Sequence, residues 1–362
     1  MRPPGVEPGT FWFEARRSIQ LSYGRNFDIR PQIYYSNYIN KSVGMIKQKQ
    51  AEIKIPKEVA GILKTLEGAG FEAFLVGGCV RDVLLGVEPK DWDVTTNAKP
   101  EQIQKIFSTF SGATADKPAT IYENEFGTVG IKTGSEEENL KIVEVTTYRT
   151  EGKYSDKRHP DSVKFAETIE EDLSRRDFTV NAMAIKLPTN NLQPTTNNWK
   201  EFLVDPYGGQ KDLNNKIIRA VGDARERFEE DALRMLRAVR FACQLDFEIE
   251  SKTFEAIQKE ANLLRRISVE RIRDEFVKII MTSGGARGVQ MLYEVGLLKY
   301  ILPELIEGVG VSQNKHHIYT VWEHNVRALD YSIQKNYSFE VRLASLLHDV
   351  GKPETKRGEG PD

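Results

Sequence analysis

The chain has 362 residues and a mass of 41.2 kDa, which is enough for two or three packed units. Hydrophobic residues make up 40% and charged residues 29% of it, as in an ordinary globular protein, and no run of about 18 apolar residues predicts a membrane span. The net charge of −2 argues against a generally basic nucleic-acid binder, although a local basic stripe can contact phosphates. The two cysteines, Cys79 and Cys243, argue against a disulfide framework or a cysteine-built zinc site and predict a cytoplasmic protein.

The first 44 residues differ from the rest of the chain. They show neither helical nor strand periodicity, and they lack the pattern of a signal peptide. From Met45 onward the sequence is typical of a domain start, with Pro56 at a helix entry followed by apolar residues at helical spacing up to Leu66. We therefore expect residues 1–44 to be a non-native upstream extension, with a disordered but genuine tail as the alternative.

The elements that follow alternate between strands and short helices. The pattern predicts strands over 71–76 and 92–95, helices over 80–85 and 100–110, and alternating strands within 126–134 and 140–149. This order predicts an α/β unit on a small mixed sheet. Residues 188–202 form a polar stretch, predicted as a loop, and nearly everything from 223 to 303 is predicted to be amphipathic helix.

Residues 77–93 of the predicted head contain several side chains suited to binding phosphate and metal. The glycine pair Gly77 and Gly78 lets the backbone approach a bulky anion, and Arg81 adds a cation for a phosphate. Asp91 and Asp93 lie two apart in a predicted strand, so their carboxylates point to one face. Two carboxylates beside a phosphate pocket suit one or two Mg²⁺ ions. The simpler alternative is a solvated turn followed by an ordinary pair of surface aspartates.

Neither GxGxxG nor GxxxxGK[ST] occurs in the chain, which excludes the two commonest phosphate-binding loops. The pattern GG-x-VRD-x-LLG followed by DxD instead resembles the active-site motif of the nucleotidyltransferase superfamily. It is most similar to the class II branch, with its CCA-adding tRNA nucleotidyltransferases and bacterial poly(A) polymerases. Further segments resemble this family in its motif order: 144–165, 170–184, 205–213, 227–243 and 267–280.

The resemblance implies an α+β fold, in which a head with a small mixed sheet and helices precedes an all-helical neck and body and the start of a helical HD domain. The expected parts are the extension 1–44, the catalytic head 45–187, an insertion loop and hinge 188–222, the neck and body 223–310, and a partial HD domain 311–362.

The family's residue roles carry over position by position. By resemblance, Gly77 and Gly78 cradle a triphosphate with Arg81, Asp91 and Asp93 hold Mg²⁺, and Arg176 meets the nucleotide. Glu144 is a candidate third carboxylate, with a plain edge-strand glutamate as the alternative. Residues 148–160 resemble the family's flexible loop. The neck residues implied to contact the nucleotide are Asp231, Arg234, Arg237 and Arg240.

Asp231 and Arg234 are three residues apart, so a continuous helix would place them on one face. An aspartate accepts and an arginine donates hydrogen bonds, which matches the paired amino donor and ring-nitrogen acceptor of cytosine and adenine but opposes uracil and guanine. Alternatively, the neck arginines pair with Glu226, Glu229 and Glu230 in a solvated lattice.

The end of the chain suggests a second site. His324 on a predicted helix, followed by His348 and Asp349, resembles the HD phosphohydrolase superfamily, whose histidines and aspartates bind a divalent transition metal. The alternative is a structural histidine. The family's last aspartate would lie well past Asp349, so we expect either that the chain is a fragment or that this site is incomplete.

The predicted function is the metal-dependent addition of C and A from CTP and ATP to the 3′ end of tRNA, with release of pyrophosphate. The alternatives are a poly(A) polymerase, an enzyme that adds only CC or only A, and an HD-type phosphohydrolase that acts on RNA ends. A tRNA surface built from phosphate contacts is expected on later helices, whose cations are Arg265, Arg266, Arg271, Arg273 and Lys278. The sequence does not predict an oligomeric state.

Overall fold

The structure is a computed structural model of the whole chain, and it describes residues 55–108, 120–123, 127–152, 163–187, 199–313 and 318–355. The chain divides between Ile46 and Lys47, and every described residue lies in the second unit. The predicted extension 1–44 and most of the predicted flexible loop lie outside the described residues. Within the described ranges, no helix is both long and apolar enough to cross a membrane.

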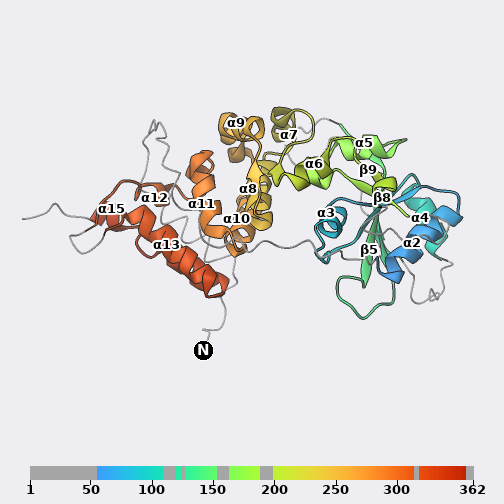
Figure 1. Cartoon of the computed structure of the whole chain (residues 1–362), viewed down its shortest axis with the longest axis horizontal. Coiled ribbons are helices and arrows are strands. Elements are labelled where there is room, and N and C mark those ends of the chain that lie inside the picture. Colours follow the sequence, from blue (N-terminus) through green and yellow to red (C-terminus); the bar gives the residue numbers. More distant parts are fainter. Residues whose placement is uncertain are drawn as a thin grey trace, which may run out of the picture. The chain divides into compact units, whose positions relative to one another are not determined.

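A seven-stranded mixed sheet organises the head (Figure 1). Its strand order is β3-β4-β5-β2-β1-β8-β9, in which β2 and β5 are parallel and the other neighbours are antiparallel. The strands are β1 (Ala73–Val76), β2 (Asp93–Thr96), β3 (Thr120–Glu123), β4 (Thr128–Lys132), β5 (Ile142–Thr147), β8 (Ala184–Lys186) and β9 (Leu203–Val204). The predicted mixed sheet is confirmed, and it includes a strand from the range that was predicted as insertion loop and hinge.

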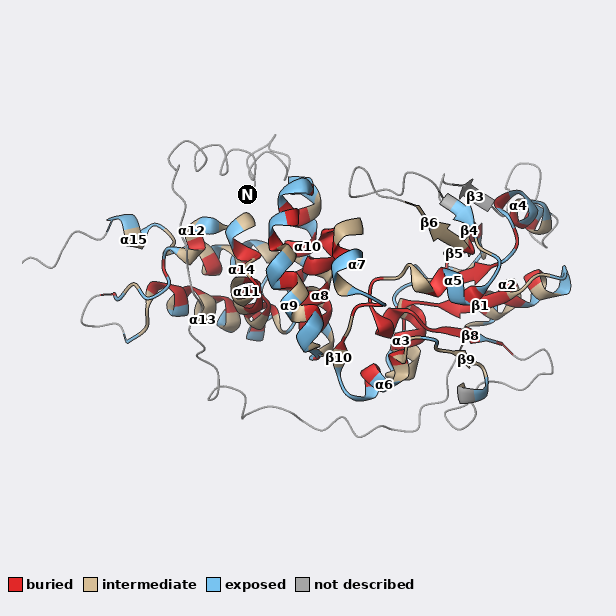
Figure 2. Cartoon of the chain, turned by 90° about the horizontal axis from the view of Figure 1, so that it is seen from above, coloured by how far each residue is buried: buried red, intermediate tan, exposed pale blue. Residues whose placement is uncertain are grey.

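Side-chain alternation along the strands separates the two faces of the sheet. Leu75, Val94 and Val145 join the large core that includes the apolar side of α2 (Lys57–Gly68) and α4 (Pro100–Ser108). Phe74 and Val76 point to the other face and join a smaller cluster with α5 (Ile169–Ser174). Strand β1 is therefore buried along its whole length (red in Figure 2), whereas β5 alternates between buried and more exposed residues.

Short elements complete the head and the connection to the helical region. Helix α3 (Gly78–Leu84) follows β1 directly, and the 3-10 helix η1 (Thr179–Asn181) packs against α6 (Gly209–Asn214). A Cβ at Gly209 would collide with the carbonyl oxygen of Thr179, so this close approach requires glycine. The remaining short elements are β6 (Arg149–Glu151), β7 (Val163–Phe165), η2 (Trp199–Glu201), β10 (Ile217–Ile218) and β11 (Glu248–Ile249).

The region after residue 223 is helical, as predicted, apart from β11. Its elements are α7 (Ala224–Glu230), α8 (Leu233–Leu245), α9 (Ser251–Glu260), η3 (Ala261–Arg266), α10 (Val269–Met281), α11 (Gly285–Glu294), η4 (Leu298–Tyr300) and α12 (Pro303–Ile306). Most of α8 is buried against α10 and α11. A Cβ at Gly288 would lie 3.0 Å from the Cys243 sulfur, so glycine allows α11 to approach α8 closely.

Three further helices follow: α13 (Val321–Gln334), α14 (Phe339–Leu347) and α15 (Lys352–Thr355). Helix α13 begins with a capping box between Thr320 and Glu323. Buried Arg342 of α14 donates to the carbonyls of Ile280 and Met281, each at 3.1 Å, at the end of α10. A cation at a helix C-terminus satisfies its unpaired carbonyls and complements its dipole, so Arg342 joins α14 to α10.

Candidate active site

A group of carboxylates lies on one face of the sheet. In the parallel pair of β2 and β5, Asp93 is the register partner of Glu144, and the neighbouring pair Val94 and Val145 points into the core. Asp93 and Glu144 therefore face the opposite side, together. Strand β5 lies between β4 and β2, so the alternative reading of Glu144 as an edge-strand residue is wrong. Asp91 is exposed and lies two residues before β2 begins. The prediction that Asp91 lies inside this strand is therefore wrong.

The electrostatics of this group are those of crowded acids. Burial raises the pKa of Asp93 to about 6, the guanidinium of Arg176 acts against this rise, and the carboxylates of Glu144 and Asp91 add to it. A divalent cation would relieve the same repulsion, and carboxylate oxygens are the protein ligands that Mg²⁺ prefers. These residue types therefore fit a Mg²⁺ site, and the assignment of Asp91 and Asp93 as its ligands, with Glu144 as a third acid, stays a prediction.

The glycine turn lies next to this group. Gly77 has a φ of 80° and precedes α3, and the thiol of Cys79 on that helix lies 3.7 Å from the carbonyl oxygen of Asp93. A Cβ on Gly77 would be 2.7 Å from Nη1 of Arg176, so that guanidinium would have to shift, and the positive φ of this position also favours glycine. The buried Nε of Arg176 has no hydrogen-bond partner among the described residues. An unpartnered guanidinium nitrogen beside a glycine turn suits an anionic ligand.

The Arg81 guanidinium is hydrogen-bonded to other side chains of the protein. Its side chain is buried, Nη1 donates to Oδ1 of Asn181 at 2.7 Å, and Nε donates to Oδ1 of Asp82 at 2.8 Å. Its guanidinium also lies 5.3 Å from the ring centroid of Phe241. These contacts fix Arg81 between the glycine turn and the neck. Direct contact between Arg81 and a phosphate stays a prediction.

Asp231 and Arg234 do not share a helix, which corrects the prediction from their spacing. Asp231 has extended backbone angles and ends α7, and its Oδ1 accepts the backbone N–H of Leu233 at the start of α8. Its Oδ2 also accepts from Nη2 of Arg271 at 2.7 Å. The helix breaks here because Asp231 caps the next helix and pairs with an arginine far along the sequence.

Three arginines of the neck helix α8 each pair with a different carboxylate. Arg234 pairs with Glu230 at 2.6 Å, as the alternative predicted, but Arg234 is buried and also donates to the carbonyl of Arg175, so the pair does not belong to a solvated lattice. The lattice alternative does not describe the ion pairs of Arg237 and Arg240, which reach other elements. Arg237 binds Asp177 at 2.6 Å, and Arg240 lies 3.1 Å from Glu275.

Phe241 is the centre of a cationic cluster between the head and the neck. The guanidiniums of Arg81, Arg237 and Arg240 lie 5.3, 5.2 and 4.5 Å from its ring centroid. Phe178 of the head contacts the same ring edge to face at 5.8 Å. Such contacts favour cations over an aromatic face. Both Arg237 and Arg240 have partners inside the protein, and their contact with the nucleotide stays a prediction.

The cations predicted to bind tRNA divide into two kinds. Arg271 binds Asp231, Arg273 binds Asp274, and Lys278 binds Glu275. Arg265 and Arg266 are exposed at the end of η3, and the Arg265 guanidinium lies 5.2 Å from the ring centroid of Tyr300. Of the five, Arg265 and Arg266 are the two that form no ion pair with another residue of the described ranges.

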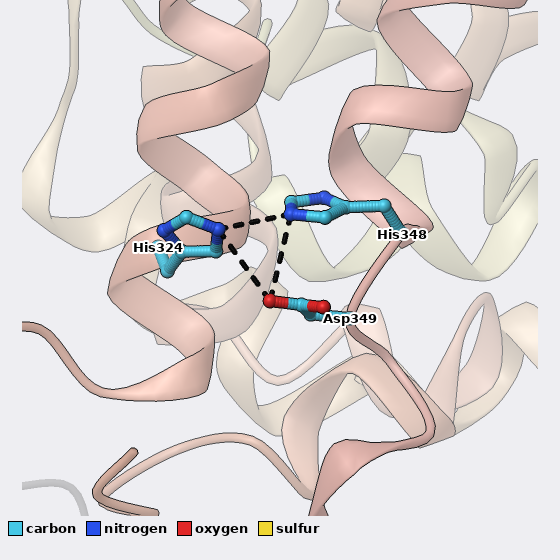
Figure 3. A group of neighbouring side chains, drawn as sticks. All are labelled: His324, His348 and Asp349. Carbon is cyan, nitrogen blue, oxygen red and sulfur yellow. Dashed lines mark hydrogen bonds and ion pairs between the residues drawn. The ribbon is translucent and has the colours of Figure 1, made fainter. Parts of the chain in front are cut away.

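A second cluster lies in the last helices (Figure 3). His324 of α13, His348 at the end of α14 and the following Asp349 offer ligand atoms that all lie within 4.8 Å of one another. The two Nε2 atoms are 2.9 Å apart, and Nδ1 of His348 lies 2.8 Å from the carbonyl oxygen of Ser345. If Nδ1 donates to that carbonyl, Nε2 keeps a lone pair for a metal.

Lys352 forms an ion pair with the one carboxylate of this His-His-Asp cluster, Asp349. Its Nζ lies 2.6 Å from Oδ2 of Asp349 and donates to Oε1 of Gln313 at 2.9 Å. The spacing of His324, His348 and Asp349 correctly predicted that they meet. The lysine contact is the feature that sequence reasoning missed, although Lys352 lies only three residues past Asp349.

Two segments of the chain match known protein families. Residues 73–219 match the family described as the poly A polymerase head domain, and residues 246–308 match the probable RNA and SrmB-binding site of polymerase A. The head and the helical region of the chain are thus similar to the head domain and the RNA-binding region of poly A polymerases.

Among curated proteins, the chain is similar to CCA-adding enzymes. That of Ligilactobacillus salivarius (strain UCC118) is 44% identical over 244 residues, which are 67% of this chain and 54% of the relative. That of Lactobacillus helveticus (strain DPC 4571) is 47% identical over 236 residues, which are 65% of this chain and 53% of the relative. The chain therefore spans about half the length of the curated relatives that it matches.

Solved structures give the same picture. The Bacillus stearothermophilus CCA-adding enzyme in complex with CTP is 33% identical with a TM-score of 0.58, and the match covers 82% of this chain and 64% of that one. A tRNA nucleotidyltransferase complexed with a primer tRNA and an incoming ATP analog is 25% identical with a TM-score of 0.58, covering 79% and 75%. The predicted fold class, a mixed-sheet head followed by a helical region, is confirmed.

Proposed function

We propose that the chain carries the catalytic part of a CCA-adding tRNA nucleotidyltransferase, which adds C and A from CTP and ATP to the 3′ end of tRNA and releases pyrophosphate. The observation that carries this proposal is the carboxylate group of Asp93, Glu144 and Asp91 beside the Gly77 turn and Arg176. The likeness to structures bound to CTP, and to primer tRNA with an ATP analog, supports it. A cytoplasmic location stays a prediction.

The reaction follows from what these groups can do. The 3′-hydroxyl oxygen of the RNA forms a bond to the α-phosphorus, the bond from that phosphorus to the β-phosphate oxygen breaks, and pyrophosphate leaves as the hydroxyl proton is released. Asp91 and Asp93 would hold Mg²⁺, which would supply charge neutralisation for the triphosphate and would lower the pKa of the attacking hydroxyl. Arg176 and the glycine turn position the nucleotide, and positioning with charge stabilisation is the main source of rate in such transfers.

The residues proposed to select the base, Asp231 and Arg234, lie at the junction of α7 and α8. The Asp231 carboxylate accepts and the Arg234 guanidinium donates, which matches the amino group and ring nitrogen of cytosine and adenine. Uracil and guanine would leave buried groups opposed, at roughly 1–3 kcal/mol for each group. Arg271 on Asp231 and Glu230 on Arg234 hold both side chains in place. This arrangement favours C and A without a nucleic-acid template.

The alternatives give different products on a tRNA that lacks its last three nucleotides. A CCA-adding enzyme adds two nucleotides with CTP alone and three with CTP and ATP together. A CC-adding enzyme stops at two, an A-adding enzyme extends only tRNA that already ends in CC, and a poly(A) polymerase adds a run of A with ATP alone. Sequencing the 3′ ends from these three reactions distinguishes the candidates, and a ladder of A with ATP alone would contradict the proposal.

We also propose that the His-His-Asp cluster of His324, His348 and Asp349 is a divalent transition-metal site of the HD type. Its support is the compact group of ligand atoms and the Nδ1 contact of His348 with the carbonyl of Ser345. Wild-type protein should bind about one more Mn²⁺ than the variant His348→Ala, with Asp93→Asn as the control that affects only the head. Equal Mn²⁺ binding by the wild type and His348→Ala would reject this site.

A further inference from the structure

Asp172 is a buried carboxylate in α5 that the reaction described above does not use. Its side chain is 0% exposed. Oδ1 accepts from Nε and Nη2 of Arg175 at 3.0 and 2.9 Å, and Oδ2 accepts from Nη2 of Arg176 at 3.3 Å. Oδ1 also lies 3.3 Å from the backbone nitrogen of Arg149, at the start of β6. One carboxylate thus contacts two adjacent arginines and a strand.

The ionised form of Asp172 is the one that these contacts favour. Burial opposes ionisation, but the charges and hydrogen bonds of Arg175 and Arg176 outweigh it, so the pKa of Asp172 lies below its ordinary value. A buried anion held by two guanidiniums fixes their positions, because each contact is charge-assisted and screened from water.

Of the two arginines, Arg176 reaches the nucleotide site. Its Nη1 lies against the space that a Cβ on Gly77 would fill, and its charge acts on Asp93. Arg175 points to the same carboxylate, and its backbone carbonyl accepts from Nη2 of Arg234 at 3.2 Å. Two of the side chains that the proposed function assigns to the nucleotide, Arg176 and Arg234, are therefore attached to the segment that Asp172 orders.

We infer that Asp172 is a positioning residue that holds the Arg176 guanidinium against the Gly77 turn for the nucleotide triphosphate. The inference rests on the proposed function and deepens it, since Asp172 itself touches no substrate. Without the carboxylate, Arg176 keeps its charge but loses its anchor, and it can turn toward Asp93 or solvent. The loss should appear in nucleotide affinity and should pass entirely through Arg176.

The test is a double-mutant cycle on equilibrium binding of CTP and of ATP. Asp172→Asn should weaken binding of both nucleotides about tenfold in the wild-type background and less than about twofold in the Arg176→Ala background. Asp212 provides a matched control, because it is also buried and accepts from Arg219 at 2.9 Å, on α6. Asp212→Asn should lower the melting temperature comparably and leave nucleotide affinity unchanged.

The outcomes separate this inference from the proposed function. Equal losses from Asp172→Asn in both backgrounds, or a loss shared with Asp212→Asn, would show a general structural role and overturn the inference. A wild-type chain that binds CTP but extends no tRNA would fail the proposed function alone, and one that binds neither nucleotide would overturn both. If Asp172→Asn does not fold, Asp172→Glu keeps the charge and should give a smaller loss with the same dependence on Arg176.

Discussion

The ion pair between Asp177 and Arg237 should be a main connection between the head and the neck. Asp177 lies in the head segment after Arg176, its side chain is 9% exposed, and its Oδ2 accepts from Nε and Nη2 of Arg237 at 2.8 and 2.6 Å. Oδ1 accepts from Asn181, which in turn accepts from Arg81. The substitution Arg237→Gln removes the cation and leaves this carboxylate buried beside neutral partners.

The size of the effect follows from the burial and the pKa. Burial alone would raise the pKa of Asp177, but Arg237 and Asn181 outweigh it and bring the pKa to about 2, from an ordinary 3.8. That difference corresponds to about 2 kcal/mol of stabilisation at neutral pH. Breaking a fully buried pair can cost about 3–5 kcal/mol, but the Arg237 side chain is 35% exposed, so solvent reduces the loss. We expect Arg237→Gln to lower the free energy of unfolding by about 2 kcal/mol.

The matched control is Arg273→Gln. Nη2 of Arg273 lies 2.7 Å from Oδ1 of Asp274, a distance similar to that of the Arg237 pair. Because Asp274 is 56% exposed, Arg273→Gln should lower the free energy of unfolding by less than about 0.5 kcal/mol. Urea unfolding of both variants and the wild type at pH 7 and at pH 3 gives the comparison. The folded-state pKa of Asp177 is depressed, so its contribution is present above about pH 4 and is lost as the pH falls toward 2. Equal losses for the two variants, or a gap between the wild type and Arg237→Gln that does not shrink at low pH, would refute the reasoning.

Four further predictions concern the sites. Asp93→Asn should abolish nucleotide addition because it removes a metal ligand at the site mouth, whereas tRNA binding should persist in a filter assay; turnover above about a tenth of wild type would contradict the metal assignment. Gly77→Ala should weaken CTP binding about tenfold because its Cβ meets Arg176, while Gly86→Ala, which also has positive φ but open space, should leave binding unchanged; similar losses would show that backbone strain alone matters. Asp231→Ala should raise UTP incorporation relative to CTP, measured by competition among four nucleotides, and unchanged selectivity would move base reading elsewhere. Lys352→Gln should strengthen Mn²⁺ binding at the His-His-Asp cluster about tenfold, because the ammonium no longer competes for Asp349, and weaker binding would mean that Lys352 supports the site.

Local patterns predicted the head well because they depend on neighbouring residues. Alternation along β2 and β5 separates Val94 and Val145 from Asp93 and Glu144, and a glycine pair at a strand end marks a turn with positive φ. Likewise, His324 and the His348–Asp349 pair stand at two helix positions that a simple antiparallel contact brings together.

Contacts between distant segments account for what the sequence did not predict. The run from Glu229 to Arg234 has no glycine or proline, so it resembles one continuous helix, and the break at Asp231 depends on Arg271, 40 residues away. Arg237 pairs with Asp177, 60 residues earlier, although nearer glutamates are available. The two-residue strands β10 and β11 are too short for a periodic signal. Long-range pairing of this kind is set by the assembled core.

Under the proposed function, the protein transfers nucleotides to the 3′ end of tRNA and depends on the Asp93 carboxylate to do so. The most direct measurement incubates purified protein with Mg²⁺, CTP, ATP and tRNA that lacks its last three nucleotides, and compares pyrophosphate released with nucleotides added. The wild type should release three pyrophosphates for each tRNA extended by CCA, and Asp93→Asn should release none. Pyrophosphate release without RNA extension, or extension that survives Asp93→Asn, would contradict the account.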